Sequence, residues 1–570
     1  MIDGKPIVSA VGLFRKFNLD SPLDAQEWYV EEQDGVRKSY ISYNGRMVED
    51  GCVRISAQFV RPAGEEKKPV VLFLPDMEQD VNDELISFFL SRGYAVLMPD
   101  YRGYAENESI HERHTLYPGS LDHGNYIYAR GLYDLQGISA EESTWFEWTY
   151  VALFSIEYLK SREDVGEIGV VGVRSGGTIA WLLALSPDVK CCVPINAAGW
   201  TSYQKTAKFG NAPAQTLSDD RRRYIAAYEA QSYAPYAKCP VLMLCSLRDK
   251  SFDCDRAYDT YSRIGNKEEN GLAYSPLSGD CIGPNALTNL QLFLEKNLKG
   301  RQIYLPDTLK IQIVEKDGGL EIQVRGDEEG LVAEAGIFYA EADTSVKSVY
   351  RDWQCICELE GSQLHNGGFN YQIKPYAGAT TVYAFAYAKY LNGFRITSKI
   401  AAIHVSKKED AVRNRCLFTG GQAMCFHIAD HRRSAVGGLF LEQEIVPRIT
   451  YGYGDIQGVY AKGGVRTYRI SSPEYLPAEN DLLQFEGYSK ESQTLRVIVE
   501  VGDIHEEEEK FVCYVYIKGG GKWKRRLLRA EDFKSETTGK SLTSFTRANA
   551  LVFACDGEEQ EFSVTNLLWL

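Results

Sequence analysis

The amino-acid sequence predicts an α/β domain with a mostly parallel central sheet and helices on both faces, followed by two all-β sandwich domains. The first observation is length, because 570 residues exceed what one hydrophobic core usually serves and indicate about three domains. The second is an alternation of strand-like runs with amphipathic stretches over residues 1–305. The third is a change near residue 300 to alternating strand patterns, which places the sandwiches at 306–406 and 411–570.

Four nearly continuous apolar runs mark the expected strands of the first domain. Strands of a parallel sheet are buried on both faces, so they read as unbroken hydrophobic stretches rather than as alternating ones. The runs are Val70–Leu74, Tyr94–Met98, Ile168–Gly172 and Val241–Cys245. The sequence therefore predicts a buried, mostly parallel sheet in this part of the chain.

Two amphipathic stretches between these runs, at 84–91 and 145–160, predict helices. Thr144 and Glu147 have the spacing of a capping box, which would begin the second helix. This helix carries an aromatic stripe at helical spacing, which we interpret as helix-on-sheet packing. The stripe consists of Phe146, Tyr150, Phe154 and Tyr158.

The chain after residue 300 carries the alternating pattern of half-buried strands. Runs such as Leu309–Val314 and Thr381–Tyr387 predict a sandwich of roughly immunoglobulin-like size. The charged segment Lys407–Asp410 is interpreted as a linker to a second strand-rich domain, in which grouped glycines indicate turns. These glycines are Gly420-Gly421, Gly463-Gly464 and Gly519-Gly520-Gly521.

Composition and charge restrict the classes of partner. Hydrophobic residues make up 44% and charged residues 25% of the chain, which is typical of a globular protein. The formal net charge of -15 repels phosphate backbones and anionic membranes, so we expect no nucleic-acid and no membrane partner. A small molecule or a carbohydrate fits better, and a homo-oligomer stays open. The acidic run Glu506–Glu509 is interpreted as a solvated loop between strands.

The cysteines and the start of the chain bear on cofactors and compartment. The 13 cysteines are scattered, include the adjacent pair Cys191 and Cys192, and lack the repeated Cys-x-x-Cys spacing of zinc sites. We interpret them as reduced, mostly buried thiols, and we expect no metal and no organic cofactor. The first residues lack the basic segment and apolar run of a secretion signal, and no stretch reaches the roughly 18 apolar residues of a membrane helix. We therefore expect a cytoplasmic protein.

Two motifs carry a resemblance to a known family. The segment Arg92–Gly103 resembles the fourth-strand segment of α/β-hydrolases, and the strand ending at Gly172, followed by Gly176-Gly177, resembles their nucleophile elbow. The resemblance covers roughly residues 35–300 and is nearest to the acetyl-xylan-esterase and dienelactone-hydrolase-like branch. It implies an α/β-hydrolase fold for the first domain, with a serine, histidine and acid triad as the expected machinery.

The elbow departs from the family pattern. In that fold the strand ends in a tight Gly-x-Ser-x-Gly turn, with small residues flanking the nucleophile. An ungapped match puts Arg174 in the nucleophile position and Ser175 one place beyond it. The alternative is a one-residue insertion that places Ser175 in the nucleophile position. That alternative leaves Val173 at a flanking position, where a β-branched residue fits poorly.

The acid of the triad has a match, whereas the histidine does not. The segment Cys239–Asp249 resembles the acid-bearing strand and puts Asp249 in the acid position. Pro276–Cys281 stands in place of the family's Pro-x-x-Gly-His pattern, with Asp280 where the histidine belongs. A serine without a base is a weak nucleophile at neutral pH. The three substitutes that an earlier loop could supply are His111, His114 and His123.

The oxyanion region departs as well, because Pro75-Asp76 stands where the family has a His-Gly pair. Proline donates no hydrogen bond, and a carboxylate opposes the negative charge that such a site stabilises. We therefore predict a degenerate triad of Arg174, Asp249 and Asp280, in which Arg174 bridges one or both carboxylates. Arg174 would then either plug a vestigial pocket or recognise an acidic group on a ligand.

Three functions follow from these motifs. The first is a catalytically impaired hydrolase homologue that acts as a binding or scaffold protein, with carbohydrate as one candidate ligand. The second is a working serine esterase that uses Ser175 as nucleophile with Asp249 and an unusual base. The third is a structural protein whose β domains mediate self-association.

The end of the chain adds a second resemblance. Segments 522–533 and 562–570 resemble the closing strands of galactose-binding-like, carbohydrate-binding-module sandwiches. Such modules bind sugars on exposed aromatic rings. The candidates for a sugar platform are Tyr451, Tyr453 and Tyr460, which lie in a glycine-rich stretch, and the alternative for them is turn packing. Trp523 and Trp569 are expected in the core.

Overall fold

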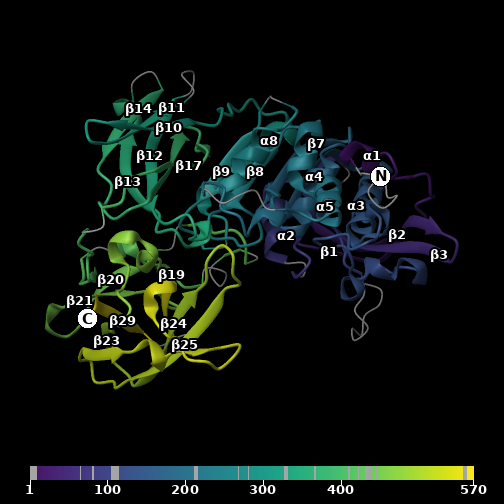
Figure 1. Cartoon of the computed structure of the whole chain (residues 1–570). Coiled ribbons are helices and arrows are strands. Elements are labelled where there is room, and N and C mark those ends of the chain that lie inside the picture. The colour runs from purple at the N-terminus through teal and green to yellow at the C-terminus, as the bar shows by residue number, and fades with distance from the viewer. Residues whose placement is uncertain are drawn as a thin grey trace.

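The computed structural model contains one large mixed sheet and four smaller antiparallel sheets (Figure 1). It describes residues 9–570 apart from 65, 80–82, 104–113, 211–215, 267–268, 280, 327–330, 365–366, 409–410, 422, 431–434, 437, 444–445 and 556–560. Two residues singled out in the sequence, His111 and Asp280, lie outside the described residues.

The first domain is built on a nine-stranded sheet with the order β1-β2-β3-β5-β4-β6-β7-β8-β9. Strands β4 to β9 pair in parallel, and β1, β2 and β3 join them through antiparallel pairs. The four apolar runs predicted as strands fall in β4, β5, β6 and β8, which confirms the predicted fold class. The bounds are β1 (Gln26–Gln33), β2 (Val36–Val48), β3 (Gly51–Pro62), β4 (Lys68–Leu74), β5 (Ala95–Pro99), β6 (Val165–Val173), β7 (Val189–Ile195), β8 (Leu242–Ser246) and β9 (Gly271–Ser275).

Helices cover both faces of this sheet. Along β4, Leu72 and Leu74 belong to the core that contains α3 and α4, whereas Val71 and Phe73 belong to the core that contains α2 and α8. This alternation explains the continuous apolar run of β4, because each face of the strand packs against its own helical layer. The bounds are α1 (Ala10–Phe14), α2 (Asp83–Leu90), α3 (Thr144–Lys160), α4 (Ser175–Leu183), α5 (Asp219–Tyr228), α6 (Ala230–Tyr233), α7 (Ala257–Tyr261) and α8 (Pro284–Lys299).

Helix α3 contains the predicted aromatic stripe but not the predicted capping box. The four aromatic rings are buried, and Tyr158 stacks on Tyr43 of β2 with ring centroids 4.8 Å apart. The helix is capped by Ser143 rather than by Thr144, which is its first helical residue. Thr144 donates its hydroxyl to the carbonyl of His123 instead, at 2.8 Å. The capping-box prediction was wrong because tertiary contacts engage its hydroxyl.

The first sandwich packs a three-stranded sheet, β10-β11-β14, against a five-stranded one, β13-β12-β15-β16 with β17 beside β15. Ile322 of β11 and Ala386 of β15 share one core, which joins the two sheets. The bounds are β10 (Lys310–Lys316), β11 (Gly319–Arg325), β12 (Val332–Glu341), β13 (Gln354–Glu360), β14 (Gly368–Ile373), β15 (Thr381–Tyr390), β16 (Arg395–Thr397) and β17 (Ala401–His404).

The second sandwich consists of two six-stranded sheets around a core of its own. One sheet has the order β20-β21-β29-β23-β26 with β18 beside β29, and the other has the order β19-β22-β28-β24-β25-β27. The bounds are β18 (Cys416–Phe418), β19 (His427–Ile428), β20 (Arg448–Tyr451), β21 (Gln457–Tyr460), β22 (Val465–Thr467), β23 (Leu483–Ser489), β24 (Gln493–Val501), β25 (Glu509–Ile517), β26 (Lys524–Leu528), β27 (Lys534–Ser535), β28 (Ala548–Cys555) and β29 (Phe562–Trp569).

Charged residues join the three domains. Arg351 of the first sandwich makes a two-pronged ion pair with Asp255 of the first domain, at 2.5 and 2.7 Å, and both side chains are buried. Glu508 of the second sandwich pairs with Lys250 of the first domain and with Lys347, at 3.4 Å, of the first sandwich. The interpretation of Glu506–Glu509 as a merely solvated loop was therefore wrong at Glu508, because this side chain bridges domains.

Within the part of the chain that the structure describes, no helix is both long and apolar enough to cross a membrane.

Candidate functional site

The turn between β6 and α4 is held tight by glycines. A Cβ on Gly172 would lie 2.2 Å from the carbonyl oxygen of Gly176, and a Cβ on Gly176 would lie 2.1 Å from the carbonyl oxygen of Leu74. Any side chain at these two positions would therefore collide with backbone. The glycines allow α4 to begin directly against the end of β4, where the polar residues of the site gather.

The strained position of this turn belongs to Arg174. Its backbone has φ 46° and ψ -106°, a conformation that non-glycine residues rarely adopt. Val173 is the last residue of β6, and Ser175 is the first residue of α4. Arg174 is thus the single residue that links strand and helix, and Ser175 already has a helical position.

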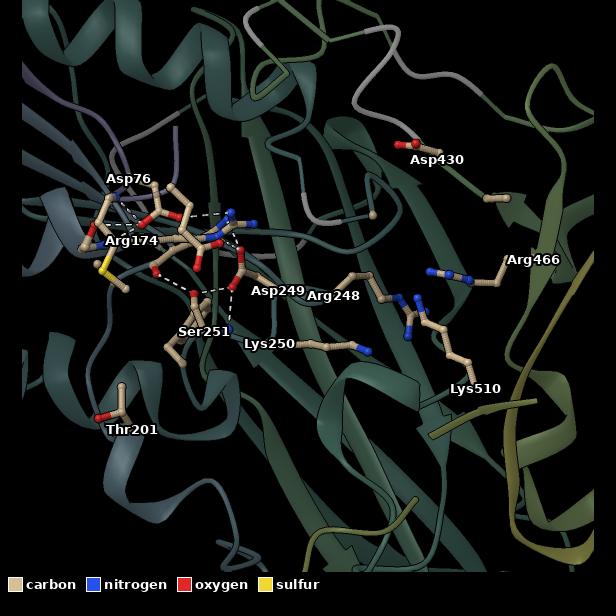
Figure 2. A pocket seen from close by; sticks show the side chains of 18 of the residues that line it. Asp76, Arg174, Thr201, Arg248, Asp249, Lys250, Ser251, Asp430, Arg466 and Lys510 are labelled. Carbon is tan, nitrogen blue, oxygen red and sulfur yellow. Dashed lines mark hydrogen bonds and ion pairs between the residues drawn. The ribbon is translucent and has the colours of Figure 1, made fainter. Parts of the chain in front are cut away.

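The Arg174 guanidinium lies between two buried carboxylates, as Figure 2 shows. Its Nε donates to Asp249 Oδ2 at 2.8 Å, and its Nη1 donates to Asp76 Oδ2 at 3.4 Å. The side chain of Arg174 is 25% exposed, whereas those of Asp249 and Asp76 are 1% and 8% exposed. The sequence anticipated the contact with Asp249 but gave Asp76 no such role. Its other expected partner, Asp280, is outside the described residues.

Asp249 is also held by groups that the sequence did not single out. Asn196 Nδ2 donates to Asp249 Oδ2 at 2.9 Å, and the Ser251 amide donates to Oδ1 at 2.7 Å. Asn196 follows β7 with a φ of 50°, and its Oδ1 accepts from the Ser246 amide at 2.7 Å. The signal for Asn196 was its place directly after a buried strand, since polar side chains at the carboxyl ends of parallel strands meet at one edge.

Ser175 is connected to Arg174 through the shared carboxylate of Asp76. Its hydroxyl donates to Asp76 Oδ1 at 2.7 Å and accepts from the Met77 amide at 2.6 Å. The hydroxyl of Tyr101 lies 2.9 Å from Ser175 Oγ and donates to the Pro75 carbonyl at 2.6 Å. Burial raises the pKa of Tyr101 well above its usual range, so this phenol stays neutral. The structure thus joins Ser175 to Asp76, and it joins Arg174 to both Asp76 and Asp249.

A carboxylate oxygen occupies the oxyanion region. The amide of Met77 lies 2.9 Å and the amide of Ser175 lies 3.4 Å from Asp76 Oδ1. The first of these amides follows β4, and the second belongs to the first residue of α4. The residues Pro75, Asp76 and Ser175, which the sequence grouped as the oxyanion region, are therefore close together, but the amides already face a negatively charged acceptor.

The earlier-loop histidines have partners of their own. His123 is buried, and its Nδ1 lies 3.0 Å from Arg130 Nη2 and its Nε2 lies 3.7 Å from Glu147. His114 Nδ1 lies 3.2 Å from Asp100 Oδ2. Both imidazoles are thus directed to charged side chains other than those of the Ser175 network.

A cavity of about 740 Å³ extends from this site to the second sandwich. Asp76, Arg174 and Asp249 line one end, and Arg248, Arg466 and Lys510 line the part shown to the right in Figure 2. The lining is mostly polar and charged. Such a cavity is large enough for a small molecule and suits a polar one.

The three tyrosines of the candidate sugar platform lie on the β20–β21 hairpin, but at two different ends of it. Tyr451 and Tyr453 are 67% and 62% exposed at the turn that joins β20 and β21. Tyr460 pairs with Arg448 in the strand register, at the other end of the hairpin, and the Arg448 guanidinium lies 4.9 Å from its ring centroid. The geometry therefore brings together Tyr451 and Tyr453, and it separates Tyr460 from them.

The two tryptophans expected in the core differ. Trp569 is buried, and its indole donates to the Tyr475 carbonyl at 2.9 Å. Trp523 is half-buried, with its ring against Gly452 and Gly458, where an added Cβ would come within 2.7 Å of the ring. These glycines let the Trp523 ring lie directly on the β20–β21 hairpin. Among the described residues, no group of three or more His, Cys, Asp or Glu could hold a metal ion.

The sheet order, the helices on both faces and the strained turn after β6 define an α/β-hydrolase fold for the first domain. Residues 55–270 match the model of the dienelactone hydrolase family. The matched residues lie within 35–300, the part of the chain for which the motifs predicted this resemblance. None of the curated proteins is a significant match to the chain.

Three solved structures illustrate the comparison. The acetyl xylan esterase from Paenibacillus sp. R4 is 16% identical with a TM-score of 0.37, over 51% of this chain and 92% of that chain. Acetyl xylan esterase 1 from Thermoanaerobacterium sp. JW/SL YS485 is 16% identical with a TM-score of 0.34, over 48% and 86%. The acylaminoacyl peptidase from Pyrococcus horikoshii is 13% identical with a TM-score of 0.34, over 50% and 52%.

Proposed function

We propose that this protein is a non-catalytic α/β-hydrolase homologue that binds a small polar molecule in the cavity between its first domain and its second sandwich. The observation that carries the proposal is the place of Arg174. It occupies the strained turn position and is paired with Asp249 and Asp76. A guanidinium has no nucleophilic lone pair at neutral pH, and here it neutralises two carboxylates. In this proposal Arg174 fills the end of the cavity that corresponds to the catalytic pocket of active α/β-hydrolases.

The surroundings of Asp76 support the same proposal. Acyl transfer needs amide donors that face the oxygen on which negative charge develops. Here the Met77 and Ser175 amides face the Asp76 carboxylate, at 2.9 and 3.4 Å. A developing oxyanion would lie beside a negative charge, which raises the barrier instead of lowering it.

The alternative function, a serine esterase that uses Ser175, has one contact in its favour. The Ser175 hydroxyl donates to Asp76 Oδ1 at 2.7 Å, so this carboxylate could serve as the unusual base. Its acid partner Asp249 is instead engaged by Arg174 and Asn196. The two functions make opposite predictions for a Ser175 variant.

Ester hydrolysis by the full-length protein and by the Ser175→Ala variant tests the proposal. We expect kcat/KM for p-nitrophenyl acetate to be near background in both, with a ratio within about twofold, because no activated nucleophile is lost. A working serine esterase would lose about 10³-fold or more. An active acetyl esterase in the same assay is the positive control, and a large Ser175-dependent loss would reject the proposal.

Carbohydrate binding on the second sandwich is a second candidate function. The exposed rings of Tyr451 and Tyr453 on one turn favour it, and Lys522 Nζ lies 5.6 Å from the Tyr453 centroid as a polar neighbour. We expect a glycan that binds the wild type on a glycan array to lose about tenfold in affinity when both tyrosines become alanine. Tyr514→Ala, an exposed tyrosine on β25, is the matched control. Equal binding by all three proteins would reject a sugar site here.

We also propose a reducing compartment, the cytoplasm. Most of the 13 thiols are buried and unpaired. Burial raises the pKa of Cys239 to about 12 and raises the pKa of Cys191 and Cys192 well above the usual value, so these thiols stay protonated.

A further inference from the structure

Arg248 is a buried cation with unused hydrogen-bond donors. Its side chain lies in the wall of the cavity, and the residue is only 6% exposed. Nη1 donates to the carbonyls of Val349 and Arg351, at 2.7 and 2.8 Å. Among the described residues, its Nε and Nη2 are buried without a hydrogen-bond partner. Leaving two donors of a buried cation unsatisfied is costly unless another group meets them.

Two more cations approach Arg248 from the second sandwich. Figure 2 shows the side chains of Arg466 and Lys510 directed toward Arg248 across the cavity. The Arg248 guanidinium lies 3.7 Å and that of Arg466 lies 6.0 Å from the ring centroid of Tyr468. Burial lowers the pKa of Arg248; Tyr468 and Asp352 oppose this shift, and the nearby charge of Arg466 adds to it. The second sandwich thus brings two positive charges close to the positive charge of Arg248 in the first domain.

The carboxylates around the cavity neutralise only part of this charge. Glu500 pairs with Arg466 at 3.0 Å. Three further ion pairs involve residues that line the cavity: Lys250 with Glu508, Arg496 with Glu536, and Arg174 with Asp249. Neither Arg248 nor Lys510 makes an ion pair within the described residues. Asp430 also lines the cavity and Asp352 acts electrostatically on Arg248, but among the described residues neither carboxylate forms an ion pair with Arg248 or Lys510.

We propose that Arg248, Arg466 and Lys510 form a binding site for a doubly charged oxyanion, the phosphate monoester group of a small polar molecule. Arg248 offers its Nε and Nη2 and Arg466 its Nε, which are buried without a hydrogen-bond partner among the described residues, and Lys510 adds a point charge. The inference rests on the proposed ligand-binding function and names the chemical class of the ligand. Because Arg248 comes from the first domain and the other two residues from the second sandwich, the anion ties these domains together.

Calorimetric titration of the full-length protein with inorganic phosphate at low ionic strength tests the site. We expect saturable binding with a Kd of about 1 mM or tighter, since free phosphate lacks the rest of the ligand. Lys510→Ala is expected to weaken it about fivefold or more, and Arg466→Gln about tenfold. Lys518→Ala is the matched control, because Lys518 is exposed just beyond the other end of β25 and outside the cavity lining. It should stay within about twofold of the wild type.

Two competing anions, sulfate and glucuronate, test whether the site requires a doubly charged oxyanion. Sulfate should displace phosphate at similar concentration, and phosphate should bind at least about fivefold more tightly than glucuronate, a monovalent carboxylate. Absence of saturable phosphate binding, or equal affinity in the wild type and Lys510→Ala, would overturn the inference. Neither result changes the ester-hydrolysis assay, so a failed anion site and a failed non-catalytic function are distinguishable. Lys510 is exposed, so its loss should leave the melting temperature unchanged.

Discussion

Replacement of Arg174 by alanine is expected to lower the free energy of unfolding of the first domain by about 2–4 kcal/mol. The variant leaves the carboxylates of Asp249 and Asp76, 1% and 8% exposed, without their shared cation. The expected loss lies at the lower end for a broken buried pair because the arginine is itself 25% exposed. Urea unfolding followed by the fluorescence of the buried Trp148 and Trp181 measures it.

A glycine at the same position separates the ion pairs from the backbone strain. Arg174→Gly also removes the cation, but glycine adopts a φ of 46° without the steric cost that alanine has there. We expect the glycine variant to be about 1 kcal/mol more stable than the alanine variant and still less stable than the wild type. If the alanine variant unfolded within about 0.5 kcal/mol of the wild type, Arg174 would not be holding the turn through its carboxylate partners.

Replacement of Arg351 by alanine is expected to have the largest effect, a loss of about 3–5 kcal/mol. Its ion pair with Asp255 is two-pronged and joins the first domain to the first sandwich, and the residues are 3% and 5% exposed. The Arg351 guanidinium also lies 3.7 Å from the ring centroid of Tyr383. The same urea experiment measures the loss, and the two domains should then unfold in separate transitions.

The control for this variant is an exposed ion pair. Arg529 pairs with Glu531 at 3.1 Å, with side chains 70% and 67% exposed. Arg529→Ala should therefore change the free energy of unfolding by about 1 kcal/mol or less. A loss below about 1 kcal/mol for Arg351→Ala, equal to that of the control, would show that the Asp255 contact does not hold the domains together.

The sheet of the first domain could be predicted because its strands are buried on both faces. Val70–Leu74 reads as a continuous apolar run since Leu72 and Val71 face different helical layers. The start of α3 could not be predicted in the same way. Thr144 and Glu147 have capping-box spacing, but the Thr144 hydroxyl binds His123 and the Glu147 carboxylate binds Arg46. Such tertiary contacts are invisible in a local pattern.

The sequence predicted those residues of the candidate site that lie within a recognisable motif. Arg174 and Asp249 were found because the strand-to-helix turn and the later strand have recognisable spacing. The contact between Arg174 and Asp76 was missed, since the motif assigns this position to oxyanion binding rather than to an ion pair. The cluster of Arg248, Arg466 and Lys510 could not be predicted, because domain packing alone brings its members together.

Labelling with a fluorophosphonate probe tests the central claim, that the hydrolase site is no longer catalytic, most directly. The probe forms a covalent bond only with an activated serine. Intact-mass measurement on the full-length protein and on Ser175→Ala should show no adduct on either, while an active serine esterase in the same reaction is fully modified. An adduct on the wild type that is absent from Ser175→Ala would contradict the claim and identify Ser175 as a working nucleophile.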